Sequence, residues 1–111
     1  MADTTYNGWT NYETWLVNLW MDNEQGSQDY YREQARDIYD DAQAKPHLTR
    51  EEVARIHFAD WLQQEHEDNR PEMPASGVYY DLLSGALSEV NWDEIARHYI
   101  EAIEEEANAN S

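Results

Sequence analysis

Residues 7–27 read NGWTNYETWLVNLWMDNEQGS and hold three of the five tryptophans in the chain. Thr10 and Glu13 have the spacing of a capping box, in which a hydroxyl and a carboxylate each accept a hydrogen bond from a free backbone N–H group at a helix start. Apolar side chains then recur at intervals of three and four residues, which is the period of one helix face. We therefore expect a helix that starts here and ends near Gly26. Its core stripe would consist of Tyr12, Trp15, Leu16, Leu19 and Trp20.

The same period predicts helices in the rest of the chain. A second helix is expected over residues 27–44, a third from a capping box at Thr49, a fourth from Val78 and a fifth from a cap at Asn91. Residues 65–76 are polar, contain two prolines and form the longest connection. No segment alternates with the two-residue period of a strand.

These elements predict an all-α fold, a compact bundle of about five helices without a sheet. A chain of 111 residues fits one domain, so residues 1–111 should form a single helical unit. We expect its ends, residues 1–8 and 106–111, to fray. The predicted core consists of Trp15, Leu19, Ile38, Trp61, Leu82, Leu83, Ile95 and Tyr99.

Acidic residues dominate the charge of the chain. The 24 Asp and Glu residues outnumber the 7 Lys and Arg residues, giving a formal net charge of -17 at pH 7. Direct binding to nucleic acid or to an anionic membrane is disfavoured, because phosphate contacts need cations, and a basic protein partner is favoured instead. There is no cysteine for a disulfide, and no apolar run is long enough to span a membrane. We expect a cytoplasmic protein, inside a host cell.

No motif in the sequence carries catalytic chemistry. The histidines lack the spacing of metal ligands, and no nucleophile elbow or glycine-rich phosphate loop is present. We therefore expect no cofactor, no metal and no enzymatic activity. The four histidines, His47, His57, His66 and His98, are interpreted as surface or helix-end residues.

Carboxylates are arranged in rows along two of the predicted helices. In the second helix they recur at every fourth residue, so that their Cβ atoms lie about 5–6 Å apart on one face. This spacing is similar to that of successive phosphates along a nucleic-acid strand. We therefore expect a non-enzymatic inhibitor that imitates phosphate charge and occupies the nucleic-acid groove of a basic host protein. The candidate partner-binding acids are Asp29, Glu33, Asp37, Asp40 and Asp41, followed by Glu101, Glu104 and Glu105.

Other interpretations of the same residues stay open. Arg32 and Arg36 are placed to neutralise Asp29 and Glu33 within the second helix, and the acidity would then serve only solubility or salt adaptation. The protein would in that case be a general interaction or assembly module, compatible with a homodimer. Trp9 lies off the predicted stripe and either packs against the start of the first helix or anchors a partner.

Two long, tryptophan-rich blocks carry a resemblance to known proteins. They are YNGWTNYETWLVNLWMDNEQGS at residues 6–27 and DLLSGALSEVNWDEIARHYIE at residues 81–101. With them, the chain resembles a group of short acidic proteins carried by phages and plasmids. That group has no established activity or catalytic residues, so the resemblance assigns no site. It implies a mobile-element setting, in which small acidic proteins often act against host defence or regulation.

Overall fold

The computed structural model describes residues 6–109, apart from the side chain of Gln25. This part of the chain is an all-α domain of five helices with no strand, which confirms the predicted fold class. The helices are α1 (Tyr12–Asn23), α2 (Gln25–Asp41), α3 (Arg50–Asp68), α4 (Val78–Glu89) and α5 (Trp92–Ala109).

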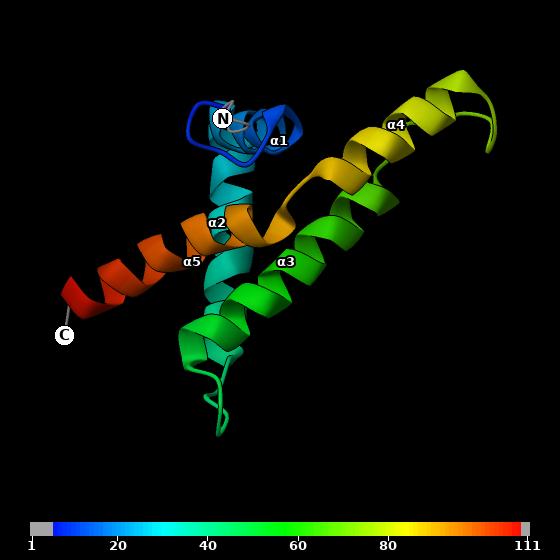
Figure 1. The fold of residues 1–111 in the computed structure, drawn as a ribbon. Coiled ribbons are helices and arrows are strands. Elements are labelled where there is room, and N and C mark those ends of the chain that lie inside the picture. The colour runs from blue at the N-terminus through cyan, green and yellow to red at the C-terminus, as the bar shows by residue number, and fades with distance from the viewer. Residues whose placement is uncertain (1–5, 110–111) are drawn as a thin grey trace, which may run out of the picture.

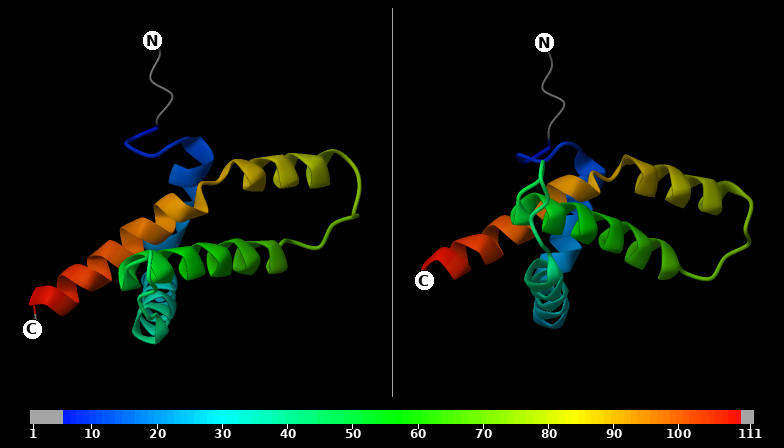
Figure 2. Two further views of the ribbon diagram at one scale, coloured as in Figure 1. Left: turned by 60° about the horizontal axis from the view of Figure 1, so that its bottom comes forward. Right: turned by 90° about the horizontal axis from the view of Figure 1, so that it is seen from below.

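Helix α5 is the centre of the packing. It lies across α2 and against α3, and α1 packs on α2 and α5 (Figure 1). Helix α4 and the loop before it project from this group, and among the described helices the backbone of α4 lies close only to α1 (Figure 2). The domain therefore has a packed body of four helices and one peripheral helix.

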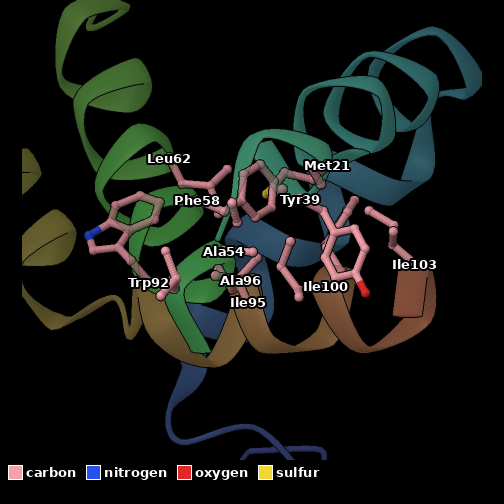
Figure 3. Close-up of a cluster of buried hydrophobic side chains, with 14 of the residues drawn as sticks. Met21, Tyr39, Ala54, Phe58, Leu62, Trp92, Ile95, Ala96, Ile100 and Ile103 are labelled. Atoms are coloured by element: carbon pink, nitrogen blue, oxygen red, sulfur yellow. The ribbon is translucent and has the colours of Figure 1, made fainter. Parts of the chain in front are cut away.

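The core lies where α3 meets α5 (Figure 3). Phe58 and Leu62 of α3 are completely buried beside Ile95 and Ile100 of α5, and Met21 of α1 closes one side. The prediction of Ile95 and Tyr99 as core residues is confirmed, while Ile38 and Trp61 pack against the core as partly buried side chains.

The predicted buried stripe of α1 is wrong. Its buried residues are Thr14, Asn18 and Met21, which lie on the opposite side of the helix. Trp20 is 62% exposed, Tyr12 is also exposed, and Trp15 and Leu19 are only partly buried. Thr14 can face inward because its hydroxyl donates to Asn11 Oδ1 and accepts from the Asn91 N–H. Asn18 Nδ2 donates to Asp22 Oδ2 at 3.1 Å, whereas Asn18 Oδ1 is buried without a partner among the described residues.

The predicted core also fails on α4, where no residue is buried. Leu82 is 64% exposed and Leu83 is partly buried. The periodicity of α4 is that of an amphipathic helix, but the rest of the described chain offers too little apolar surface to cover it.

Helix boundaries follow the predicted caps with small shifts. The capping box of α3 is confirmed, since Thr49 Oγ1 accepts from the Glu52 N–H at 3.1 Å and Glu52 Oε1 accepts from the Thr49 N–H at 3.2 Å. Helix α2 spans Gln25–Asp41, and so begins and ends earlier than expected. Helix α5 continues through residues 106–109, where fraying was expected. Residues 1–5 and 110–111 of the predicted frayed ends lie outside the described residues.

Hydrogen bonds join the start of α1, in the first of the two blocks quoted above, to the start of α5, in the second. Asn11, not Thr10, caps α1 by accepting from the Thr14 N–H at 2.9 Å. Thr14 Oγ1 accepts from the Asn91 N–H at 2.9 Å, and Glu94 Oε1 accepts from the Thr10 N–H at 2.9 Å. Asn91 in turn caps α5 through the Glu94 N–H at 3.0 Å. We call this group, Thr10, Asn11, Thr14, Asn91 and Glu94, the capping junction.

Candidate functional site

The acidic residues predicted on α2 share one exposed face of that helix. The opposite face carries Ala35, Tyr39 and Ala42, which are buried in the core. Packing of these three residues fixes the rotation of α2, so the carboxylates point to solvent. We call this face the acidic strip; it consists of Asp29, Glu33, Asp37, Asp40 and Asp41, all exposed.

Four carboxylates of the acidic strip have no ion pair among the described residues. The exception is Asp40, whose Oδ1 lies 3.9 Å from Arg50 Nη2. Arg50 also donates to the backbone oxygens of Tyr39 and Asp40, at 3.1 and 3.3 Å, and its guanidinium lies 4.3 Å from the centre of the Tyr39 ring. Arg50 therefore mainly closes the C-terminal end of α2, and the strip keeps most of its negative charge.

The two arginines of α2 do not neutralise the strip, although their spacing allows it. Arg36 Nη2 instead bonds Glu106 Oε2 of α5 at 2.8 Å. Arg32 forms no ion pair within residues 6–109. Both line a groove of about 460 Å³ between α2 and α5, together with Tyr99 and His98. The arginines thus flank the acidic strip on the side of α5.

The predicted acids of α5 divide between two environments. Glu101 and Glu105 are exposed, on the side of α5 away from its buried face. Glu104 is partly buried and meets Glu51 of α3, and their hydrogen bond, with partial burial, raises the pKa of the Glu51 carboxyl. Glu104 therefore belongs to the contact between α3 and α5, and only Glu101 and Glu105 are free to meet a partner.

Trp9 lies against the body of the domain. Its backbone pairs with Tyr6 in a tight turn, with N–H to O distances of 2.7 and 2.8 Å. The indole packs edge-on against His98, with ring centres 5.5 Å apart, and is half-buried. Trp9 therefore fixes the N-terminal turn on α5 and presents only part of its ring to solvent.

Sequence reasoning missed a polar group at the end of the α2–α5 groove. Asp22 of α1 accepts from the Tyr99 hydroxyl at 2.5 Å and from Asn18 Nδ2. Burial and this bond raise the pKa of Tyr99 well above its usual value. The signal was present as Asn18 and Asp22, four residues apart on α1, but the aromatic stripe placed the core on the other face.

The described residues hold no group of three or more His, Cys, Asp or Glu side chains that could bind a metal ion. Within the same residues, no helix combines the length and apolar character needed to cross a membrane. The surface chemistry that does stand out in this part of the chain is the unpaired negative charge on α2.

Fold and surface together define a small all-α protein whose exposed helix α2 carries a strip of largely unpaired carboxylates. The chain belongs to a family of unknown function, DUF7249, whose model matches residues 2–109. No curated protein and no solved structure matches it.

Proposed function

We propose that this protein binds the cationic surface with which another protein holds nucleic acid, and thereby blocks that surface. The observation that carries the proposal is the acidic strip. Four of its carboxylates, at every fourth residue from Asp29 to Asp41, are exposed and have no ion pair in the described chain. They extend over about 18 Å of helix and so present a linear array of charge, as a phosphate backbone does.

Repulsion among the carboxylates of the acidic strip lowers the stability of α2, which favours a role for the strip in binding and not in folding. Like charges at this spacing destabilise a helix by a few tenths of a kcal/mol per pair. A cationic groove would remove that repulsion and gain charge-assisted hydrogen bonds. Long-range attraction would also speed association, because a net charge of -17 steers a basic partner toward the protein.

The resemblance to short acidic proteins of phages and plasmids suggests where the partner is found. A mobile element benefits from blocking host proteins that bind its nucleic acid, so we propose a host defence or regulatory protein as the target. In this role the protein contacts no nucleic acid itself and performs no chemistry.

The test is capture from host lysate on the immobilised protein, followed by competition with duplex DNA. The strip variant neutralises the four unpaired acids and carries Asp29→Asn, Glu33→Gln, Asp37→Asn and Asp41→Asn. The control variant removes the same charge from exposed positions on α3 and the loop after it and carries Asp60→Asn, Glu67→Gln, Asp68→Asn and Glu72→Gln.

We expect the native protein and the control variant to retain a nucleic-acid-binding protein that duplex DNA and salt release. The strip variant should retain much less of it. Equal retention by the strip variant, or retention that is insensitive to both DNA and salt, would show that the strip is not a phosphate mimic.

A further inference from the structure

Helix α4 carries apolar side chains on two opposite faces, yet none of its residues is buried. A third side is polar, with Asp81, Ser84 and Ser88, so α4 is amphipathic with an apolar arc too wide for one contact to cover. Among the described helices, the backbone of α4 comes close only to that of α1, near the end where Asn11 Nδ2 donates to the Glu89 carbonyl at 2.6 Å. Residues 6–109 therefore leave much of α4 uncovered.

The inner face of α4 is held by its own chain. Tyr80, Leu83 and Leu87 lie on this face and are partly buried, and Leu87 packs against the core. Arg70, from the loop before α4, donates to Ser84 Oγ at 3.0 Å and lies over the Tyr80 ring at 5.4 Å from its centre. These contacts fix which side of α4 faces outward.

The outer face forms a regular seam. Val78, Leu82, Gly85 and Glu89 follow one another at intervals of four, three and four residues, the spacing by which one helix packs along another. Val78 is 63% exposed and Leu82 is 64% exposed. Beside them, Tyr79 is the most exposed large apolar side chain of the described residues, at 76%. We call Val78, Leu82, Gly85 and Glu89 the outer seam.

We propose that the outer seam of α4 pairs antiparallel with the same seam of a second copy of this chain. A two-fold axis between Leu82 and Gly85 would place the leucine of each copy against the glycine of the other. Glycine has no side chain, so the two helices can approach closely at the centre of the contact. One symmetric contact would cover the apolar seams of both copies.

Charge complementarity supports this orientation. Gly77, which precedes α4, provides no side-chain cap, so the free N–H groups of the first turn have no side-chain cap among the described residues, and Asp81 is the acid that this turn carries. Glu89 places a negative charge at the C-terminal end, where the helix dipole is also negative. Antiparallel pairing brings the Glu89 carboxylate of each copy beside the first turn of the other, so both unfavourable ends are relieved.

The high negative charge limits the strength of this dimer without preventing it. The outer seam contains no acid other than Glu89, and the body of each copy lies at the opposite end of a helix about 18 Å long. That distance exceeds the screening length of about 8 Å at physiological salt. The interface is also smaller than the roughly 800 Å² per partner of a standard complex. We therefore expect a weak dimer that salt strengthens.

Sedimentation equilibrium of the full chain, at several concentrations and at low and high NaCl, tests the proposal. The average mass should rise with concentration from 13.1 kDa toward twice that value, and the dissociation constant should fall several-fold at high salt. A mass that stays at that of the monomer under all conditions, or a dimer that salt dissociates, would overturn it.

Substitutions locate the interface. Leu82→Glu should weaken the dimer at least tenfold while circular dichroism stays unchanged, because the side chain is exposed in the monomer. Ile56→Glu, which adds the same charge at an exposed position of α3, should leave the dimer intact. Dimerisation that survives Leu82→Glu would place the contact elsewhere and contradict the proposal.

Cysteine cross-linking tests the orientation independently, because the natural chain has no cysteine. When Leu82→Cys and Gly85→Cys proteins are mixed and oxidised, the antiparallel seam should favour the mixed disulfide. Gly85 has open space around it, so a cysteine fits there in the monomer. Preferential linkage of each variant to itself would indicate parallel pairing and refute the proposed geometry.

Discussion

Thr14 shows how a polar residue can hold the centre of this fold. It is completely buried, and its hydroxyl donates to Asn11 Oδ1 at 2.6 Å while accepting from the Asn91 N–H. The side chain thereby joins the start of α1 to the start of α5. The buried hydroxyl therefore uses its donor and accepts one hydrogen bond, so Thr14 can occupy the capping junction without being an apolar residue.

We predict that Thr14→Val lowers the free energy of unfolding by about 1–3 kcal/mol. Valine keeps the shape but leaves the Asn91 N–H buried without its acceptor. Denaturant unfolding followed by circular dichroism measures the effect. Thr14→Ser, which keeps the hydroxyl, should lose less, and a valine variant as stable as the native protein would show that the junction is not important for folding.

The pair of Glu51 and Glu104 makes stability depend on pH. The pKa of Glu51 is raised in the folded state, so the protonated form is favoured there. Its stabilising contribution is present below the unfolded pKa and is lost as pH rises through the folded pKa. At neutral pH the two carboxylates repel each other across the contact between α3 and α5.

Glu51→Gln should therefore stabilise the protein at pH 7 by a few tenths of a kcal/mol, and this advantage should disappear as Glu51 itself becomes protonated in acid. Thermal unfolding from pH 4 to pH 7 measures the difference. Glu67→Gln removes an exposed charge on the same helix and should show no comparable pH dependence. A stabilisation that persists unchanged in acid would contradict this assignment.

At the scale of the elements, helix number, helix order and two of the caps could be predicted because these depend on local sequence, whereas the capping box expected at Thr10 is replaced by a cap at Asn11. The two predicted caps are the capping box at Thr49 and the cap at Asn91. The buried face of α1 could not be predicted, because periodicity counts apolar residues as internal and cannot recognise that the Thr14 side chain bonds Asn11 and Asn91 outside the helix while Asn18 bonds Asp22 within it. The acidic strip was predictable, since four-residue spacing keeps side chains on one helix face wherever that helix packs.

The pairing of Arg36 could not be predicted from spacing within α2. Its partner Glu106 is 70 residues away in sequence, and the two meet only because α2 packs against α5. The exposure of α4 escaped prediction for a related reason. Its sequence specifies an amphipathic helix with a wide apolar arc, but whether anything covers the outer seam depends on the other elements and on other molecules.

Two glycines near helix starts should respond in opposite ways to substitution by alanine. Gly26 lies in the first turn of α2 with open space around it, so Gly26→Ala should stabilise the protein by about 0.5–1 kcal/mol. Gly77 also has open space but has a φ of 112°, which is unfavourable for alanine. Gly77→Ala should therefore destabilise by about 1 kcal/mol or more. Thermal unfolding compares the two variants, and equal shifts would show that the backbone conformation has no such effect.

For the whole molecule, the distribution of charge separates two surfaces. The acidic strip lies on α2, beside Arg32 and Arg36, and four of its five acids form no ion pair among the described residues, whereas the outer seam of α4 is apolar with one acid. Salt should affect them in opposite directions, weakening the proposed binding of a basic partner through screening and strengthening self-association by reducing repulsion between copies. The two proposals can therefore fail or succeed independently.

The most direct test of the central claim is the affinity of the captured basic partner for the native protein, the strip variant and the control variant, measured by titration at physiological salt. We expect the strip variant to bind roughly thirtyfold or more weakly, equivalent to about 2 kcal/mol, and the control variant to bind nearly as well as the native protein. Equal weakening of both variants would show that only total charge matters, and would contradict the acidic strip as the binding surface.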